Sequence, residues 1–322
     1  MLCETYANTL DSGDLFRDWL VETVNDVKGN RIRNKYCKVN VYNIGPASHK
    51  VCRFEFDGEE YSVVSKFYAE PTGWKTNYDP VKSLKREFKT LQMLDKIISI
   101  PKPIAANEDF NCALVTEFVQ GEPLYAFMRS EHGLYDRLIS VADLLRKLHD
   151  RTRSNEYAKK EEFANFHKIL DQLHLDGPSR LMYNELLGNW WHNSVSDEKT
   201  GCRIHNDANP VNYVFDNSKI YALDFEGSWE HANRVHDLGV VTAELKHYFA
   251  LHKGDATRAE PYIGHFLWHY CRGDLEEFRR ITRALPFFMA MGLLRIARLH
   301  IDNDHGMYIN QEAIACLRSL RV

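Results

Sequence analysis

The segment HNDANPVNYVF at residues 205–215 is followed, after the polar stretch 216–219, by IYALDFE at residues 220–226. The apolar residues of both segments are typical of two short buried strands, and the polar stretch between them is typical of a turn. The sequence therefore predicts a polar loop that leads into a hairpin. Such a layout would place Asp207, Asn212 and Asp224 together at one end of the hairpin.

The three side chains offer carboxylate and amide oxygens, which suit a hard divalent cation. Mg²⁺ keeps some of its water molecules and takes phosphate oxygens as further ligands. A carboxylate left over beside such a metal could accept the proton of a hydroxyl group. These are the groups that phosphoryl transfer needs, because its catalysis consists mainly of positioning and charge neutralisation.

The loop also carries a family resemblance. Its His-x-Asp-x-x-x-x-Asn spacing at 205–212, with Asp-Phe at 224–225, resembles the catalytic and metal loops of protein kinases. Pro210, and Glu226 where protein kinases have glycine, are more similar to the aminoglycoside phosphotransferase and choline kinase branch of that superfamily. The resemblance implies an α+β, two-lobed protein kinase-like fold. Its N-lobe would be an antiparallel β-sheet with one main helix, and its C-lobe would be mostly helical.

Composition agrees with two lobes and excludes some partners. The chain has 322 residues, 44% of them hydrophobic, which is enough for a sizeable core. A net charge of -4 gives no basic excess, so no nucleic-acid partner is expected.

The start lacks a basic region followed by an apolar run, and no apolar stretch is long enough for a membrane span. Seven scattered cysteines without a Cys-x-x-Cys pair are expected to be reduced. We therefore expect a cytoplasmic protein without a membrane partner; its oligomeric state stays open.

The first third of the chain reads as a leading helix followed by strands. The apolar residues of 15–24 recur at helical spacing after Asp14, a suitable N-cap. Strands are predicted at 39–44, 51–56 and 61–67, then near Ile104 and at 113–119, with a long helix from Pro80 to Ile97. The loop 45–50 contains a single glycine. In a kinase-like fold this loop would lie over the nucleotide phosphates, with Ser48 and backbone amides as the contacts.

Lys66 lies within the third predicted strand, and Glu87 is the only glutamate on the following helix. This arrangement resembles the kinase ion pair that aligns the α- and β-phosphates. A Gly/Pro-containing connector after Val119 resembles the hinge that binds adenine through its backbone, here over Glu117 to Val119. We therefore divide the chain into a nucleotide-facing N-terminal lobe, 1–119, and a C-terminal lobe, 120–322, that carries the catalytic loop and the acceptor site.

The C-terminal lobe is predicted to be helical outside the central loop. Helices are expected at 134–148, 163–175, 179–191, 237–250, 262–271, 275–284 and 286–301, with a short helix after Asn310.

Carried onto the matching residues, the resemblance implies a role for each site residue. Asp207, in the catalytic loop with Asn212, would be the base or positioning group for a substrate hydroxyl. Asn212 and Asp224 would hold Mg²⁺, and Lys66 would contact the phosphates while Glu87 orients it. His205 and Asp237 would brace the catalytic loop.

The resemblance implies an ATP-dependent, or GTP-dependent, phosphotransferase that acts on a hydroxyl of a small molecule. The acceptor stays open: an aminoglycoside, choline or ethanolamine, a sugar or a similar compound. Two other functions remain, a protein serine/threonine kinase and a non-catalytic, pseudokinase-like nucleotide-binding module. The short segment between Asp224 and Asp237 leaves little room for a peptide-binding platform, which favours a small substrate.

Overall fold

The chain folds into two compact units. The computed structural model describes residues 3–72, 78–217, 219–299 and 303–320. The first unit consists of Met1–Gly121 and Val214–Glu226, and the second of Glu122–Tyr213 and Gly227–Val322. The segment 214–226 thus belongs with the first unit, whereas the sequence-based boundary after residue 119 assigned it to the second.

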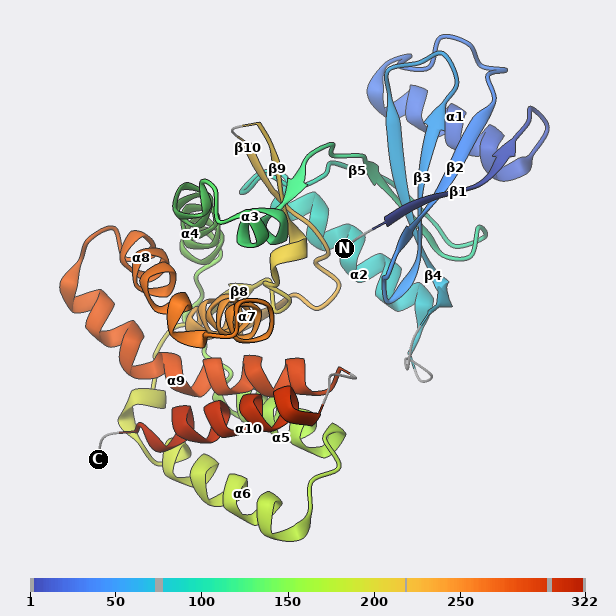
Figure 1. The fold of residues 1–322 in the computed structure, drawn as a ribbon. Helices are drawn as coiled ribbons and strands as arrows, with labels where there is room; N and C mark the ends of the chain where they lie inside the picture. The colour runs from blue at the N-terminus through green and yellow to red at the C-terminus, as the bar shows by residue number, and fades with distance from the viewer. Residues whose placement is uncertain (1–2, 73–77, 218, 300–302, 321–322) are drawn as a thin grey trace. The chain divides into compact units, whose positions relative to one another are not determined.

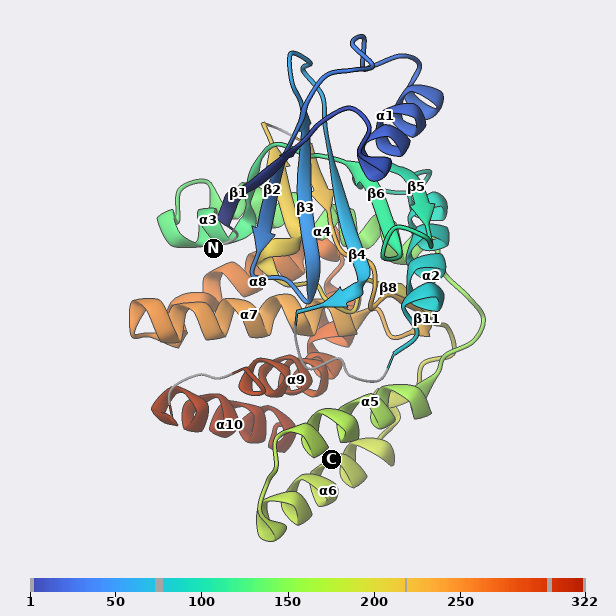
Figure 2. The ribbon, with the colours of Figure 1, turned by 90° about the vertical axis from the view of Figure 1, so that its right-hand side faces the viewer.

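A six-stranded antiparallel sheet forms the centre of the first unit, in the order β1-β2-β3-β4-β6-β5 (Figures 1 and 2). Its strands are β1 (Cys3–Leu10), β2 (Val39–Gly45), β3 (His49–Phe56), β4 (Ser62–Pro71), β5 (Pro103–Asn107) and β6 (Ala113–Glu117). The later segment of this unit contains β10 (Lys219–Ala222) and most of β9 (Tyr213–Asp216). Both strands of the predicted hairpin are therefore present.

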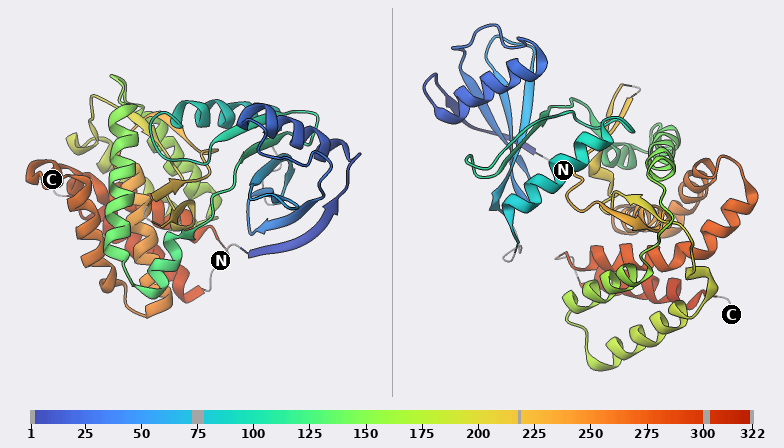
Figure 3. Two further views of the ribbon diagram at one scale, coloured as in Figure 1. Left: turned by 90° about the horizontal axis from the view of Figure 1, so that it is seen from above. Right: turned by 180° about the vertical axis from the view of Figure 1, so that it is seen from behind.

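Two helices, α1 (Leu15–Lys28) and α2 (Pro80–Leu94), belong to this unit; Figure 3 shows them and the sheet from two further directions. Asp14 caps α1 by accepting a hydrogen bond from the Arg17 amide at 2.9 Å, as the sequence predicts. Apolar residues of α1 share a buried core with Val63 and Phe67 of β4. Side chains alternate between the two faces of a strand. Lys66, between them, therefore points to the opposite face.

The second unit is mostly helical. Its helices are α3 (Leu124–Ser130), α4 (Leu134–Arg151), α5 (Lys159–Gln172), α6 (Gly177–Trp191), α7 (Val235–Lys253), α8 (Glu260–Tyr270), α9 (Leu275–Ala297) and α10 (Asn303–Arg318). Short elements connect them: β7 (Glu122–Pro123), β8 (Cys202–Ile204), β11 (Trp229–Ala232) and the 3-10 turns η1 (Ser194–Ser196), η2 (Pro210–Asn212) and η3 (Ala256–Ala259). Helix α9 lies between α7 and α10 (Figures 1 and 2). Across the described ranges, no helix is both long and apolar enough to cross a membrane.

Helices α7 and α9 approach each other closely because each carries a glycine at the contact. A Cβ atom on Gly239 would lie 2.5 Å from the backbone carbon of Phe288, and one on Gly292 would lie 2.8 Å from the Cβ of Ala243. No side chain fits at these distances without moving a helix. The contact fixes the start of α7, where Asp237 lies.

The structure corrects the prediction of separate helices at 275–284 and 286–301. One helix, α9, runs from Leu275 to Ala297 with Pro286 inside it. Proline removes one backbone hydrogen bond and usually kinks or ends a helix. Here buried residues precede and follow the proline, including Ile281, Leu285 and Phe287. Burial of this continuous apolar face offsets the missing bond.

Other boundaries differ where the sequence signal is weak. Strand β1 was not predicted, because most of its residues are exposed at the sheet edge. Helix α3 was also missed, and α10 begins at Asn303 instead of after Asn310. Helix α2 ends at Leu94, three residues before the predicted end, and β6 ends at Glu117, so Val119 lies beyond the strand.

The close helix crossing gives a stability prediction. Replacing Gly239 by alanine should lower the free energy of unfolding by about 1–3 kcal/mol, because the added methyl group overlaps the backbone of α9. Gly264→Ala in α8 is the matched control, since its Cβ would meet no atom within 4 Å. That control should keep or raise stability, because alanine favours helix more than glycine does. Equal denaturant midpoints for the two variants would contradict the close crossing.

Candidate functional site

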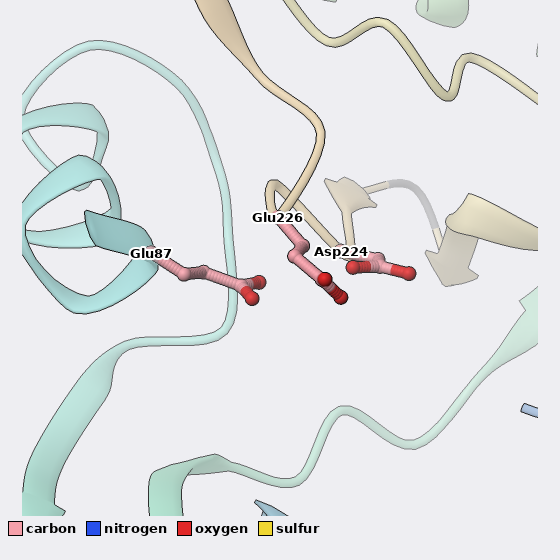
Figure 4. Close-up of side chains that lie close together, drawn as sticks. All are labelled: Glu87, Asp224 and Glu226. Carbon is pink, nitrogen blue, oxygen red and sulfur yellow. The ribbon is translucent and has the colours of Figure 1, made fainter. Parts of the chain in front are cut away.

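Lys66 forms the centre of a charged cluster within the first unit. Its Nζ atom lies 3.2 Å from Oε2 of Glu87, 2.9 Å from Oδ1 of Asp224 and 2.9 Å from Oε2 of Glu226. Lys66 comes from β4, Glu87 from α2, and the other two acids follow β10. The expected contact between Lys66 and Glu87 is thus present. Figure 4 shows the side chains of the three acids close together.

In this cluster one lysine faces three carboxylates. Burial opposes the charge of Lys66, but Asp224, Glu87 and Glu226 together raise its pKa above the ordinary value. Burial also raises the pKa of Glu87 to about 7, and the neighbouring acids add to this effect against the attraction of Lys66. Three carboxylates so close together repel one another, and a further cation beside them would relieve that repulsion.

The three carboxylates provide a donor set for a divalent cation. One ligand oxygen from each of Glu87, Asp224 and Glu226 lies within 4.8 Å of the others. Oxygen ligands of this kind suit Mg²⁺ or Ca²⁺. Glu87 is only 3% exposed, whereas Asp224 is 36% exposed. Asp224 is therefore the acid that an incoming metal nucleotide could reach most readily, Glu226 is only 12% exposed, and Glu87 positions Lys66.

Both carboxylate oxygens of Glu87 accept hydrogen bonds. Oε1 accepts the backbone N–H of Phe225 at 3.1 Å, and Oε2 accepts the hydroxyl of Tyr68. Asp224, just before Phe225, adopts a left-handed backbone conformation with φ of 58°. Aspartate tolerates this conformation better than most residues do. These contacts tie the segment after β10 to α2.

Sequence reasoning missed two contacts of Glu226, which it used only as a family marker. The Nε2 atom of buried His49 lies 3.0 Å from Oε2 of Glu226. Arg86, on α2, donates to the backbone carbonyl of Glu226 at 3.0 Å. His49 was hidden because it opens β3, in the stretch that the sequence assigned to a loop. No local spacing connects it to a residue 177 positions later.

The other predicted nucleotide contacts stay predictions. Ser48 is exposed between β2 and β3. The carboxylate of Glu117 pairs with Lys28 at 2.9 Å, so its side chain is already used. The backbone N–H groups of Glu117 and Phe118 donate to Lys102 and Ser62, respectively. Adenine contacts in this stretch would therefore use other backbone groups, among them those of Val119.

In the second unit, Asp237 organises the loop that contains Asp207. This fully buried residue lies in the first turn of α7. Its carboxylate accepts the backbone N–H groups of His205 and Asn206, both at 2.8 Å, and lies 3.0 Å from Nε2 of His149. Burial works against its charge, yet the contact with His149 and the nearby histidines hold the pKa of Asp237 below its ordinary value. The implied bracing contact is present.

Within the loop, two asparagines fix Asp207. Asn209 donates to Oδ1 of Asp207 at 2.8 Å, and Asn212 donates to its backbone carbonyl at 2.9 Å. Asn209 also caps the 3-10 turn η2 by accepting the Val211 amide at 3.0 Å. The Asp207 side chain keeps 29% of its surface exposed. A hydroxyl group could therefore approach a carboxylate whose orientation is already set.

Sequence reasoning missed Arg295, a residue of α9 that contacts this loop. Its guanidinium donates to the backbone carbonyl of Asn206 at 2.6 Å and pairs with the Asp207 carboxylate. Residues 293–296 read Leu-Leu-Arg-Ile, with the other three buried. A lone arginine in the buried part of a helix needs a polar partner. The sequence thus indicates that Arg295 needs a polar partner, but it does not indicate that this partner is Asp207, 88 positions earlier.

The predicted metal ligands Asn212 and Asp224 belong to different units. The binding of one metal ion by both residues therefore stays a prediction.

Comparisons with solved structures agree on the fold. The chain is similar to an ethanolamine kinase from Plasmodium vivax, with a TM-score of 0.61, 15% identity, and coverage of 88% of this chain and 84% of that one. It is also similar to the choline kinase LicA from Streptococcus pneumoniae, with a TM-score of 0.59, 14% identity and coverage of 94% and 99%. A third match is APH(2″)-IIa in complex with gentamicin, with a TM-score of 0.57, 15% identity and coverage of 98% of both chains. The predicted fold class is confirmed.

No curated protein sequence matches this chain significantly. A family model does match, over residues 49–278, and its description is "Phosphotransferase enzyme family". The matched segment contains Lys66, Glu87, the loop with Asp207 and the acids at 224 and 226, and it covers more than half of the chain. The family resemblance predicted from the loop is confirmed, and the chain belongs to the phosphotransferase enzyme family.

Proposed function

We propose that this phosphotransferase moves the γ-phosphoryl group of magnesium-bound ATP, or GTP, to a hydroxyl of a small molecule. The observation that carries the proposal is the cluster of Lys66 with three carboxylates from α2 and the segment after β10. A nucleotide with its metal would supply both charges that this cluster can use. The phosphates would bind the ammonium group of Lys66, and the cation would bind the carboxylates of Asp224 and Glu226.

Each side chain of the cluster has a distinct part in this proposal. Lys66 would contact the phosphates, and Glu87, fixed by Phe225 and Tyr68, would keep the lysine in place. Asp224 and Asn212 would hold the magnesium ion, and Glu226, whose carboxylate lies close to that of Asp224, would be a further oxygen ligand. The bound ion would neutralise charge on the phosphates during transfer.

The reaction would take place at the exposed carboxylate of Asp207. The acceptor oxygen forms a bond to the γ-phosphorus, the bond from that phosphorus to the bridging oxygen breaks, and the nucleoside diphosphate leaves. The hydroxyl proton passes to Asp207. Asn209 and Arg295 hold this carboxylate and Asn212 holds the backbone carbonyl of Asp207, so the orientation of the carboxylate toward the hydroxyl is set before the substrate binds.

The fold supports a general class of acceptor, whereas the loop at residues 205–212 does not distinguish one acceptor from another. Proteins with this fold include enzymes named for ethanolamine and choline, and one bound to gentamicin. All three compounds carry hydroxyl groups, which supports an alcohol acceptor. An aminoglycoside, an amino alcohol, a sugar and related compounds thus remain within the proposal. Between Glu226 and the start of α7 the chain forms one short strand, β11. So short a segment leaves little room for a platform on which a protein acceptor could dock.

The first test concerns Asp207. Asp207→Asn keeps the size of the side chain but removes the proton acceptor, so turnover should fall by about 100-fold or more. Stabilisation by Mg-ATP should remain, because the cluster around Lys66 is intact. Asp143→Asn, at an exposed position of α4, is the control and should keep full turnover. Product formation is measured as ADP release with each acceptor of a panel. An Asp207→Asn protein with unchanged turnover would contradict the assigned role and favour another base.

The second test concerns the metal nucleotide. At a concentration 100 times its dissociation constant, a ligand stabilises the native state by about 2.7 kcal/mol. Mg-ATP should therefore raise the melting temperature of the wild-type protein, and Asp224→Ala should abolish the magnesium-dependent part of this shift. Asp216→Ala, at the exposed end of β9, is the control and should keep the shift. Measurements with ATP, GTP and ADP, each with and without Mg²⁺, separate nucleotide preference from metal dependence. Equal shifts in wild type and Asp224→Ala would exclude Asp224 as a ligand.

A further inference from the structure

The side chain of His49 joins the beginning of β3 to the acid at position 226. His49 is only 1% exposed. Its Nε2 atom lies 3.0 Å from Oε2 of Glu226, and the same oxygen lies 2.9 Å from Nζ of Lys66. A carboxylate that pairs with a lysine accepts hydrogen bonds, so Nε2 of His49 is the donor. One oxygen of Glu226 thus contacts side chains from two strands, β3 and β4.

The backbone at Glu226 is fixed independently of His49. Arg86, on α2, donates to the backbone carbonyl of Glu226 at 3.0 Å. The preceding residue, Phe225, donates its backbone N–H to Glu87 of the same helix at 3.1 Å. These two bonds hold the segment after β10 against α2. The contact with Glu226 therefore attaches the beginning of β3 to a point whose place α2 already sets.

The residues just before His49 form the loop that the proposed function would place over the nucleotide phosphates. Residues 46–48 join β2 to β3. The regular pairing of β2 with β3 ends two positions after His49, and the register between β3 and β4 shifts directly after it. Thr72 binds two backbone carbonyls of the loop. The bond from His49 to Glu226 adds a side-chain tie from the end of this loop to the charged cluster.

Packing alone does not account for a histidine at this place. The ring of His49 lies between two tyrosines, with centroids 5.0 Å from that of Tyr68 and 5.6 Å from that of Tyr78. A phenylalanine ring would fill this space but would offer no N–H group to Glu226. A buried polar ring is costly unless its polar atoms have partners. The hydrogen bond to Glu226 is therefore the property that histidine supplies here.

We propose that His49 is a positioning residue that couples the loop at 46–48 to Glu226. Its hydrogen bond holds the loop at the charged cluster and orients the carboxylate that would bind the metal ion of the nucleotide. Because linkage is reciprocal, binding of the metal nucleotide orders the loop further, and the held loop raises the affinity for the metal nucleotide. The coupling rests on the proposed function, whereas the anchoring of the loop is a property of the free protein.

Three substitutions of His49 separate the hydrogen bond from the packing. His49→Phe keeps a ring between the tyrosines but removes the N–H group. His49→Gln brings an amide N–H close to the position of Nε2, whereas the side chain of His49→Asn is too short to reach Glu226. Hydrogen exchange of the Ala47 and Ser48 amides in the free protein measures how firmly the loop is held. Exchange should be about fivefold faster or more in His49→Phe and His49→Asn, and close to wild type in His49→Gln.

A double-substitution cycle asks whether His49 acts through Glu226. Glu226→Ala alone should speed exchange at Ala47 and Ser48, although β3 itself is unchanged. Adding His49→Phe to Glu226→Ala should have almost no further effect, because both changes remove the same interaction. Glu55→Gln, at the far end of β3, is the control and should leave the exchange of the loop unchanged.

Calorimetry tests the coupling to the nucleotide. It measures the dissociation constants of Mg-ATP and of ATP with EDTA. His49→Phe should weaken the binding of Mg-ATP about tenfold and that of metal-free ATP much less, so that the gain in affinity from Mg²⁺ shrinks. His49→Gln should restore most of this gain. A general loss of stability would instead lower the denaturant midpoint and speed exchange throughout the sheet.

Four results would overturn the proposal: unchanged loop exchange in His49→Phe, equal loss of protection in His49→Gln, additive effects of His49→Phe and Glu226→Ala, or an unchanged Mg²⁺-dependent gain in affinity. Failure of the proposed function would look different. In that case Mg-ATP would give no stabilisation that depends on Asp224, while exchange in the free protein would still decide whether His49 anchors the loop.

Discussion

The buried carboxylate of Asp237 is the contact on which the candidate catalytic loop depends. A charge placed inside a protein costs several kcal/mol unless hydrogen bonds and opposite charges compensate it. Asp237 receives that compensation from two consecutive loop amides and from His149, and it lies in the first turn of α7, where the helix dipole favours negative charge. The loop conformation and the ionised state of Asp237 therefore support each other. The glycine contact between α7 and α9 then fixes where this carboxylate lies.

In the cluster of the first unit, by contrast, three like-charged carboxylates lie beside one lysine. Asp237 has enough donors for its charge, whereas Lys66 faces three acids, one of which has a pKa raised to about 7. A protein optimised only for stability would remove one of these acids. Excess charge that is costly in the free protein becomes favourable when a ligand supplies the missing cation, and functional sites often show this pattern.

The sequence predicted those features whose signal is local. The strands of the hairpin and the cap at Asp14 follow from short spacings and from residue types with few alternatives, whereas the pairing of Lys66 with Glu87 was implied by the family resemblance. The contacts of Arg295 and His49 could not be predicted in this way, because each joins residues far apart in the chain. Pro286 misled the prediction of α9, since a local rule for ending helices was outweighed by burial on both sides. The roles of Glu117 and Val119 rest on backbone groups, which leave little trace in the sequence.

The continuity of α9 through Pro286 has a consequence for how this chain could diverge from its relatives. The family match ends at residue 278, early in this helix, so the far end of the helix lies outside the shared segment. This one helix therefore runs from the matched part of the chain into residues beyond the match. Arg295 lies in that outer part, yet it holds the carboxylate of Asp207, which lies within the match. A substitution at Arg295 would therefore change the setting of the proposed base without altering any matched residue.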